Sequence, residues 1–552
     1  MRATALVLFF GVLYSVDLGG TGVLDYDEAC YAEVSRVLYE EGRWLEPTLG
    51  GEPFFEKPPF TYWTQIAGFH LFGVNALGAR FFNMIAGVAS VLLVYGLARR
   101  PLGVRSAFIA AVVLGTSIEL VVLSRVALTD AWLTLFLTAS LGCFFVADER
   151  QRGGAAATAW LLASCAFAGL AMLTKGAIGL VLPAGAAFIY LAWQRRLGWI
   201  LRPSRLVPGA VVLLGVGLSW YVALGLTRPD GFAFTQELFL EHHVGRFLDA
   251  KEGHGGPIVY YIPVVLVGFL PWSPFLGIAF AGAGLRGFET ERRRLLKLFA
   301  IFAALTFVFF SLAATKLPNY VGPVFPALAL LVADGFERHR AARARGRGRA
   351  RGRAWTWAIQ LTVGSFALLG VVFALGPWIV SQLPQWLGEK RLKGFHPLRS
   401  LDLGPFPYAA AAVFAAGAVA IWMARIRRPE RVVGVVAATF AVVLTLVTTT
   451  MLRTFDRQVS GPLRAAARRA DAELPAGERI VLVSLRRKPS VSFDTGRLVH
   501  SLRRGDRDEL AELFAEPGRV GIVSEDDLDR LDGLFDHEVI GRFDGYVVFR
   551  ST

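Results

Sequence analysis

Cysteine and charged residues are scarce in this chain of 552 residues. The three cysteines, Cys30, Cys143 and Cys165, have a spacing that fits neither a disulfide framework nor a cysteine-based metal site. Only 18% of the residues are charged and 54% are hydrophobic, which excludes a soluble protein of this length. The chain also lacks a Walker-type phosphate loop and a dinucleotide-binding fingerprint. The sequence therefore predicts a membrane protein that uses no nucleotide.

Apolar stretches of about 20 residues, the length that crosses a bilayer as a helix, recur along the chain. The first follows only Arg2, has no small-residue cleavage site and precedes many more spans, so we interpret it as an anchor rather than a removed signal peptide. The prediction is an all-α polytopic membrane protein with about thirteen transmembrane helices, at 3–18, 80–98, 104–122, 127–147, 157–173, 175–193, 206–225, 258–284, 298–315, 318–335, 355–380, 408–426 and 432–450.

The formal charge of +14 predicts topology rather than a nucleic-acid partner, because Lys and Arg cluster between the apolar stretches instead of lining one face. Short cytoplasmic loops are rich in these residues. With a cytoplasmic N-terminus, all five clusters fall on the cytoplasmic side, and an odd number of spans places the C-terminus outside. The clusters are Arg99 to Arg105, Arg195 to Arg205, Arg286 to Lys297, Arg338 to Arg353 and Arg425 to Arg431.

Three segments on the predicted outer side, 19–79, 226–257 and 452–552, are too long to be simple connectors, so we expect function to concentrate there. In the first, 62–72 is apolar but too short to span, which predicts an interfacial or re-entrant helix. We divide the chain into a transmembrane catalytic domain, 1–451, and a small outer α/β domain, 452–552. In the latter, strand-like runs at 479–484, 519–524 and 546–549 surround a helix-like stretch at 506–515.

The first outer segment holds four carboxylates in nine residues, among them Asp27 and Glu28. One interpretation is a solvated amphipathic helix whose apolar face, with Tyr31, Val34 and Leu38, meets the bilayer, and in which Asp27 is merely an N-cap. The other is catalytic: Asp27 faces a cavity at the membrane surface and takes a proton from an acceptor hydroxyl, with Glu28 sharing or tuning that role.

A carboxylate, an ammonium and a rigid proline pair follow at Glu56-Lys57-Pro58-Pro59. The prolines fix the preceding groups at the mouth of the next apolar stretch. A lysine placed there can neutralise a phosphate.

Further charges fall between spans on the predicted outer side. Taken alone, Arg125 and Asp130 are best interpreted as a snorkelling arginine and a helix N-cap. If they lie beside the first segment, they can instead supply a second phosphate contact and a second acidic group. Lys175 and Lys316 run against the positive-inside bias, which favours a functional role.

The segment 226–257 contains His242, His243 and Arg246. The histidines and nearby carboxylates could bind a divalent metal, but adjacent helix residues point apart, so at most one would join such a site, and a surface helix is the simpler interpretation. Together the outer cations suit an anionic phosphate attached to a membrane-held group, which favours a lipid-phosphate donor over a nucleotide-activated one; they are Lys57, Arg125, Lys175, Arg246 and Lys316.

These motifs resemble those of the GT-C superfamily of membrane glycosyltransferases, and most of all those of bacterial lipid A aminoarabinose transferases and related dolichyl-phosphate-mannose protein mannosyltransferase-like proteins. The resemblance spans nearly the whole chain. It rests on Asp-Glu-x-x-Tyr-Ala-Glu (27–33), Phe-Glu-Lys-Pro (55–58), Thr-Asp (129–130), Leu-Thr-Lys-Gly (173–176), Glu-His-x-x-x-Arg-Phe (241–247) and Lys-Leu-Pro-x-Tyr (316–320).

The resemblance implies an inverting glycosyltransferase of the bacterial inner membrane, with a periplasmic C-terminal domain, that moves a sugar from a polyprenyl-phosphate carrier to a glycolipid such as lipid A, a glycan or a protein. It places Asp27 near the reacting groups and Lys57 at the carrier phosphate. We expect Tyr31 to contact the same phosphate. The resemblance also associates Glu56 and His242 with a bound divalent metal such as Zn, Mg or Mn.

Two positions depart from the aminoarabinose transferases: Cys30 replaces an arginine that helps to hold phosphate, and Phe54 replaces a tyrosine. The sugar and the acceptor therefore stay open. A transporter or flippase of a lipid-linked sugar is the alternative function, but it predicts inverted repeats and ionisable groups at the bilayer midplane, which the sequence does not show. A membrane scaffold that presents the C-terminal domain would leave the carboxylates and outer cations without a role.

Overall fold

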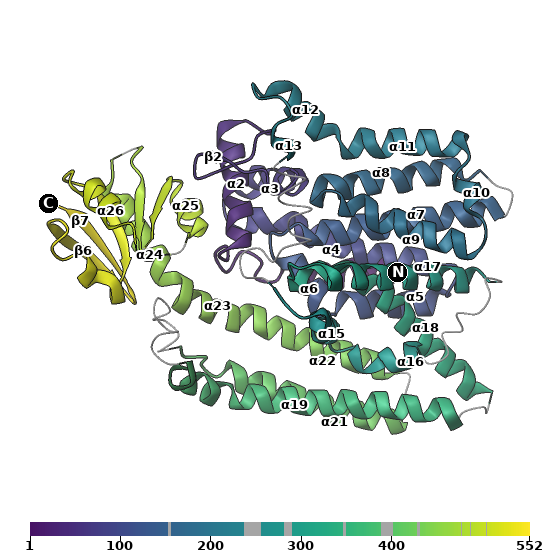
Figure 1. Ribbon diagram of the computed structural model, residues 1–552. Helices are drawn as coiled ribbons and strands as arrows, with labels where there is room; N and C mark the ends of the chain where they lie inside the picture. Colours follow the sequence, from purple (N-terminus) through teal and green to yellow (C-terminus); the bar gives the residue numbers. More distant parts are fainter. Residues whose placement is uncertain are drawn as a thin grey trace.

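The computed structural model describes residues 1–152, 156–236, 255–280, 290–345, 349–387, 401–427, 431–475, 477–485, 487–503 and 505–552. It consists of a large helical part and a small mixed unit at the C-terminus, which lies against one end of the helices (Figure 1).

The helical part follows the apolar stretches of the sequence. Its first half contains α1 (Arg2–Ser15), α2 (Asp27–Glu41), α3 (Phe60–Phe72), α4 (Ala76–Arg99), α5 (Val104–Gly115), α6 (Ile118–Arg125), α7 (Asp130–Arg152), α8 (Thr158–Lys175), α9 (Ile178–Trp193) and α10 (Leu197–Ile200). Its second half contains α11 (Pro203–Gly217), α12 (Ser219–Thr227), α13 (Phe234–Gln236), α15 (Tyr261–Gly268), α16 (Leu276–Phe280), α17 (Glu291–Leu312), η4 (Pro318–Val324), α18 (Phe325–Ala344), α19 (Arg349–Leu387), α21 (Phe406–Arg427) and α22 (Val432–Leu446).

Eight helices in the described ranges are long and apolar enough to cross a membrane, or up to eleven if each of three bent pairs counts as one span. The bent pairs are α5 with α6, α11 with α12, and the segments Ile258–Gly268 and Ser273–Phe280. Two further predicted spans correspond to the shorter helices α1 and α9, of 14 and 16 residues. At 1.5 Å per residue a 14-residue helix is about 21 Å long, short of the roughly 30 Å of a bilayer core. The chain is a multi-pass membrane protein, but the predicted count of thirteen spans is not confirmed.

The first long loop, residues 19–75 between α1 and α4, is itself structured. It holds α2, a short hairpin of β1 (Thr48–Leu49) and β2 (Glu52–Pro53), and α3. α3 is the short helix that the sequence predicts at 62–72. A left-handed residue, Gly42 with φ of 68°, ends α2 and turns the chain toward the hairpin.

The apolar face of α2 does not meet the bilayer as the amphipathic interpretation requires. Val34 and Leu38 are buried against Tyr62 and Ile66 of α3. Ser35 donates a hydrogen bond to the side chain of Gln65, 2.7 Å away, at the same contact. The two helices of the loop therefore pack as a pair and hold the start of α2 in place.

The C-terminal unit is a five-stranded mixed sheet with strand order β4-β3-β5-β7-β6. β3 pairs in parallel with β4 and β5, and β7 pairs antiparallel with β5 and β6. Two buried clusters show that α24 covers one face and α26 the other. The elements are α24 (Gly461–Glu473), β3 (Ile480–Val483), α25 (Pro489–Thr495), β4 (Val499–Leu502), α26 (Arg507–Phe514), β5 (Val520–Ser524), β6 (His537–Phe543) and β7 (Tyr546–Ser551).

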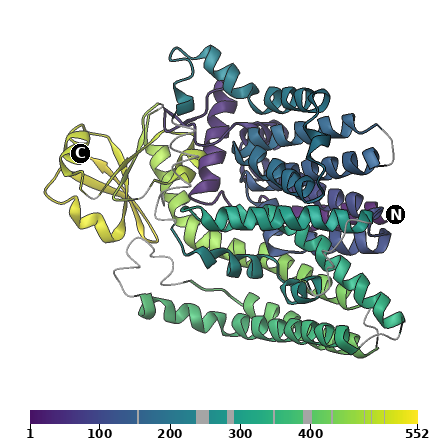
Figure 2. The ribbon, with the colours of Figure 1, turned by 45° about the vertical axis from the view of Figure 1, so that its right-hand side comes forward.

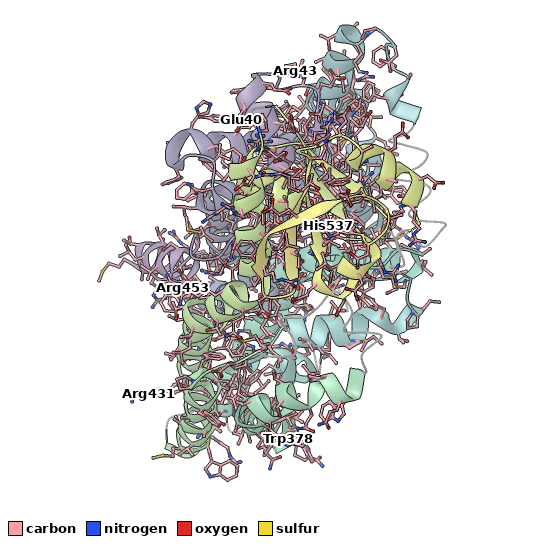
Figure 3. All side chains as sticks on the ribbon, turned by 90° about the vertical axis from the view of Figure 1, so that its left-hand side faces the viewer. Glu40, Arg43, Trp378, Arg431, Arg453 and His537 are labelled. Atoms are coloured by element: carbon pink, nitrogen blue, oxygen red, sulfur yellow. The ribbon has the colours of Figure 1, made fainter. Side chains whose placement is uncertain are left out.

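A nearly continuous helical path from Val432 to Glu473 joins the last apolar helix to this unit, as Figure 2 shows from a second side. The unit contacts the first long loop through Asp25, whose carboxylate accepts hydrogen bonds from the backbone N–H and the hydroxyl of Ser490, at 3.1 and 2.8 Å. Seen from the C-terminal side, His537 lies on the nearest sheet, whereas Trp378 of α19 is exposed at the far lower edge (Figure 3).

Candidate active site

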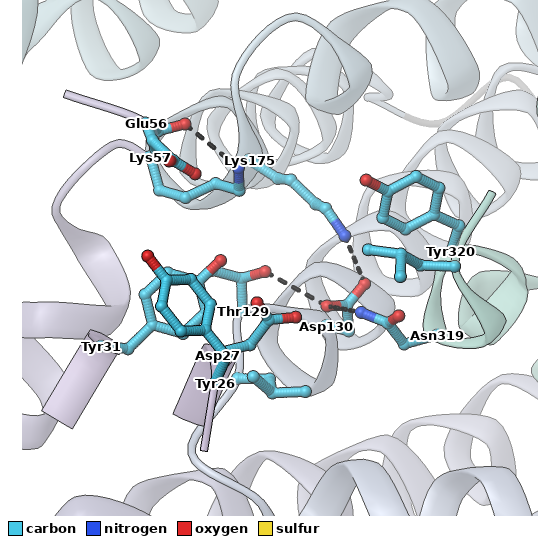
Figure 4. Close-up of a pocket in the computed structure, with 12 residues that line it drawn as sticks. Tyr26, Asp27, Tyr31, Glu56, Lys57, Thr129, Asp130, Lys175, Asn319 and Tyr320 are labelled. Atoms are coloured by element: carbon cyan, nitrogen blue, oxygen red, sulfur yellow. Dashed lines mark hydrogen bonds and ion pairs between the residues drawn. The ribbon is translucent and has the colours of Figure 1, made fainter. Parts of the chain in front are cut away.

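A narrow cavity opens where the first long loop meets α7, α8 and η4 (Figure 4). Each wall comes from a different part of the chain, which is why no single motif describes it. The lining residues are Tyr26, Asp27, Tyr31, Glu56, Lys57, Leu128, Thr129, Asp130, Lys175, Leu317, Asn319 and Tyr320.

Asp130, the first residue of α7, is buried and fully engaged. Its Oδ1 accepts a hydrogen bond from Nζ of Lys175 at 2.5 Å, in an ion pair, and its Oδ2 accepts one from the amide of Asn319 at 2.8 Å. The Lys175 ammonium also lies 4.4 Å from the ring centre of Tyr320, a cation–π distance. These contacts fix the Lys175 ammonium against the cavity.

Asp27, the first residue of α2, is exposed and lines the same cavity. Its side chain caps no helix: the N-cap position belongs to Tyr26, and no side-chain hydrogen bond is made there. In the described part of the chain the Asp27 carboxylate has no hydrogen-bond or ion-pair partner, so it is available to an incoming group.

Glu56 and Lys57 reach the cavity from the turn before α3, and the Pro58-Pro59 pair leads directly into that helix at Phe60. The Lys57 side chain is buried, and its ammonium donates a hydrogen bond to the Glu56 carbonyl at 3.2 Å. Proline at these positions restricts the backbone and supplies no N–H that would need a partner. The turn therefore holds a cation at a fixed place beside the cavity.

Tyr31 faces the cavity one turn after Asp27. Burial, with Tyr62 and the Asp27 carboxylate nearby, raises the pKa of Tyr31 well above its usual value. Its phenol therefore keeps its proton and can donate a hydrogen bond to an anion.

Glu28 does not line the cavity, and the structure corrects the prediction that it is catalytic. Its carboxylate forms a buried pair with the guanidinium of Arg80, with both contacts at 2.7 Å. The same carboxylate accepts hydrogen bonds from the backbone N–H of Ala127 and of Leu24, each at 2.8 Å. Glu28 thus ties α2 to α4 and to the segment before α7.

Two predicted phosphate ligands also lie elsewhere. Arg125 donates a 2.7 Å hydrogen bond to the carbonyl of Tyr14, near the end of α1. Lys316 donates to the carbonyls of Ser311 and Ala313, at 2.8 and 2.7 Å, and so satisfies the end of α17. Both cations stabilise helix ends and do not line the cavity.

Arg246 and His242 lie outside the described residues. Within the described ranges no group of three or more His, Cys, Asp or Glu side chains is arranged to hold a metal ion. The predicted metal at Glu56 and His242 therefore stays a prediction.

Comparison of the sequence with known proteins shows the family of this chain. The model of the dolichyl-phosphate-mannose-protein mannosyltransferase family matches residues 1–228. A protein of Edwardsiella ictaluri named undecaprenyl phosphate-alpha-4-amino-4-deoxy-L-arabinose arabinosyl transferase is 31% identical over 421 residues, which are 76% of this chain and 72% of that protein. The chain belongs to this arabinosyl transferase family. A Pseudomonas aeruginosa protein of the same name is 32% identical over 398 residues, 69% of this chain and 70% of its own.

Solved structures show the same fold. The crystal structure of ArnT from Cupriavidus metallidurans bound to undecaprenyl phosphate has a TM-score of 0.80 at 22% identity, covering 100% of this chain and 98% of that one. The apo oligosaccharyltransferase of Archaeoglobus fulgidus is more distant, with a TM-score of 0.52 at 14% identity, covering 95% of this chain and 69% of that one.

Membership of the arabinosyl transferase family makes the chain a membrane glycosyltransferase and confirms the resemblance noted in its sequence. It does not favour the transporter alternative, because the relatives are transferases.

The sequence did not predict four polar residues that line the cavity, namely Tyr26, Thr129, Asn319 and Tyr320. Asn319 and Tyr320 fall in the Lys-Leu-Pro-x-Tyr motif, in which only the charged Lys316 was predicted to contact the phosphate. Tyr26 directly precedes Asp27. Uncharged polar residues beside a charged one were the available signal.

Proposed function

We propose that this chain transfers a sugar from a polyprenyl-phosphate carrier to an acceptor hydroxyl or phosphate, with inversion at the anomeric carbon. The observation that carries the proposal is one cavity that holds an exposed carboxylate, Asp27, with no partner among the described residues, and two buried cations, Lys57 and Lys175. The cations suit the phosphate of a donor, and the carboxylate suits the proton of an acceptor.

In this mechanism Lys57 and Lys175 hold the carrier phosphate, and the Tyr31 phenol donates to one of its oxygens. Asp130 positions Lys175 through its ion pair. Asp27 accepts the acceptor proton while the acceptor oxygen forms a bond to the anomeric carbon. The bond from that carbon to the phosphate oxygen breaks, its electron pair stays on the carrier phosphate, and the cations stabilise the added charge.

The relatives are named for undecaprenyl phosphate and 4-amino-4-deoxy-L-arabinose, so that donor stands first in a panel of candidates. Cys30 and Phe54 depart from the aminoarabinose pattern, and other polyprenyl-phosphate sugars belong in the same panel. Acceptors to be compared are a lipid A-like glycolipid, a glycan and a protein.

We place this chemistry on the non-cytoplasmic face of the bacterial inner membrane, with the N-terminus in the cytoplasm. The support is charge asymmetry. Arg196, Arg294 and Arg338 form ion pairs with Asp148, Glu149 and Asp334 on helix ends and loops. α10, which follows Arg196, lies at the end of the helical part opposite the C-terminal unit (Figure 1).

The test is transfer of radiolabel from the donor panel by purified protein in lipid, with Asp27→Asn and Lys57→Ala beside the wild type. We expect one donor to support transfer in the wild type and transfer to fall sharply in both variants, through the rate in Asp27→Asn and through the KM for the donor in Lys57→Ala. Wild-type protein that moves the carrier across the bilayer without transferring sugar would overturn the proposal. Chelation with EDTA and re-addition of Zn, Mg or Mn in the same assay tests the metal at Glu56 and His242.

A further inference from the structure

A second cavity, of about 570 Å³, lies between the first long loop and the C-terminal unit. Its walls come from Gly19–Val23, which follows α1, from Val74–Ala76 at the start of α4, and from residues 456–468 and 493–494 near and within α24 and α25. In the described chain it shares no lining residue with the candidate active site. Because α1 and α22 are apolar helices that lead into these walls, the cavity lies at the edge of the membrane-embedded part.

Two arginines one helical turn apart on α24 face this cavity. Arg464 forms an ion pair with Asp456 and packs so closely on Gly22 that a Cβ there would lie 1.7 Å from the guanidinium. Arg468 is exposed, and no hydrogen bond or ion pair links it to any residue that the structure describes. The cavity therefore offers one held guanidinium and one available guanidinium, which suits a phosphate.

Two carboxylates share the cavity with the arginines. Asp456 is 5% exposed, and while its Oδ2 accepts from Arg464, its buried Oδ1 has no hydrogen-bond partner. The Asp494 carboxylate has no hydrogen-bond partner in the described ranges either, and burial raises the pKa of Asp494 to about 6. The Asp494 carboxylate lines the cavity without a hydrogen-bond donor among the described residues, so a ligand with an N–H or O–H group would gain by supplying one.

We propose that this cavity, the headgroup site, binds a phosphate-bearing polar headgroup that also carries a hydrogen-bond donor, of the phosphoethanolamine kind. Arg468, with Arg464 behind it, faces the phosphate, and Asp456 with Asp494 faces the ammonium. A purely anionic ligand would meet two carboxylates, and a purely cationic one would meet two guanidiniums. A zwitterion satisfies both halves, and its position at the membrane edge fits a lipid headgroup.

The headgroup site is linked to the loop that carries Asp27. Ser490, in the same helix as Asp494, donates two hydrogen bonds to Asp25, and the Lys488 ammonium lies 3.5 Å from that carboxylate. The inference does not depend on the proposed reaction, because it concerns binding in a separate cavity.

Native mass spectrometry of the full-length protein in detergent tests the headgroup site, with phosphatidylethanolamine and phosphatidylglycerol as probes. We expect the wild type to retain phosphatidylethanolamine in preference. Arg468→Ala and Asp494→Asn should each weaken its binding at least about fivefold, as expected for loss of a charge-assisted contact. Arg469→Ala is the matched control: it removes the same charge from the neighbouring, exposed position of α24, beside Gly541 of β6.

Equal retention of the two lipids by the wild type would overturn the proposal, as would unchanged binding in Arg468→Ala. An equal loss in Arg469→Ala would also overturn it, because general surface charge would then explain the binding. Competition by soluble phosphoethanolamine would support recognition of the headgroup alone, and retention of the lipid without such competition would support a site that needs the whole lipid.

Discussion

The ammonium of Lys175 and the carboxylate of Asp130 form a buried ion pair at the wall of the candidate active site, with Nζ 2.5 Å from Oδ1. Because Asn319 and Thr129 also donate to Oδ2 of Asp130, both oxygens of that carboxylate are occupied. Neither oxygen is then open to the proton of an acceptor hydroxyl. We therefore assign Asp130 to positioning Lys175 and leave Asp27 as the candidate base.

Asp27→Asn should lower the transfer rate by about two to four orders of magnitude, the usual contribution of a general base. The protein should stay folded, because the Asp27 carboxylate has no hydrogen-bond or ion-pair partner among the described residues. Transfer assays and thermal unfolding of the same preparation check both parts. Glu41→Gln, at the far end of α2, is the control and should leave the rate unchanged. A normal rate in Asp27→Asn would show that the base is wrongly assigned.

Glu28→Ala should act on stability. It leaves the Arg80 guanidinium buried without its carboxylate, and breaking such a pair costs about 3–5 kcal/mol. The double variant Glu28→Ala/Arg80→Met should unfold at a higher temperature than Glu28→Ala alone, because it removes the stranded charge. Thermal unfolding in detergent measures the difference. A double variant less stable than the single one would contradict this structural role.

Hydropathy predicted where the apolar helices lie but not how they bend. The stretch 104–122 appears as one span in the sequence, whereas α5 and α6 meet at an angle of 62°. A bond from the indole of Trp272 to the hydroxyl of Thr116 lies at that break, and it joins residues far apart in the chain. A hydropathy window averages composition and carries no direction, so such contacts escape it.

The C-terminal sheet was predicted only in part, because a sequence pattern detects buried apolar strands better than edge strands. The buried strands β3, β5 and β7 are runs of apolar residues and were found. The strand β6 is an edge with a partly exposed pattern, and β4 is half-buried, so neither stands out from a loop in sequence.

At the site, the positions of charged residues in the sequence predicted which residues lie near the cavity, but not which way their side chains point. Lys57 and Lys175 line it, whereas Lys316 turns back to the carbonyls that end α17. Arg125 likewise reaches the carbonyl of Tyr14, 111 positions away in the chain. Which carbonyls lack a partner is decided by how the helices end and pack, and single-residue patterns do not contain that information.

This difference predicts opposite effects for two lysines. Lys57→Ala should raise the KM for the lipid-phosphate donor at least about tenfold, because a charge-assisted contact to phosphate is lost. Lys316→Ala should lower the unfolding temperature with little change in that KM. Kinetics at varied donor concentration, beside thermal unfolding, separate the two. A raised KM in Lys316→Ala would mean that this lysine reaches the phosphate after all.

Asp494 should make the C-terminal unit sensitive to pH. Burial raises its pKa to about 6, above the value of about 3.9 for an exposed aspartate, although Arg464 and Arg468 pull it down. Between these two pH values the folded protein holds a proton that the unfolded chain has released. The stabilisation is therefore full below about pH 4 and is lost as the pH rises through 6.

Asp494→Asn removes the cost of the buried charge. Its unfolding temperature should match the wild type below about pH 4, exceed it increasingly between about pH 4 and 6, and stay above it by a constant amount at higher pH. Asp25 and Asp456 oppose ionisation of the wild-type carboxylate, and the two arginines favour it, so the midpoint reports the balance among them. Unfolding curves across this pH range, without added lipid, measure it. A difference that is constant with pH would show that Asp494 ionises alike in the folded and unfolded protein.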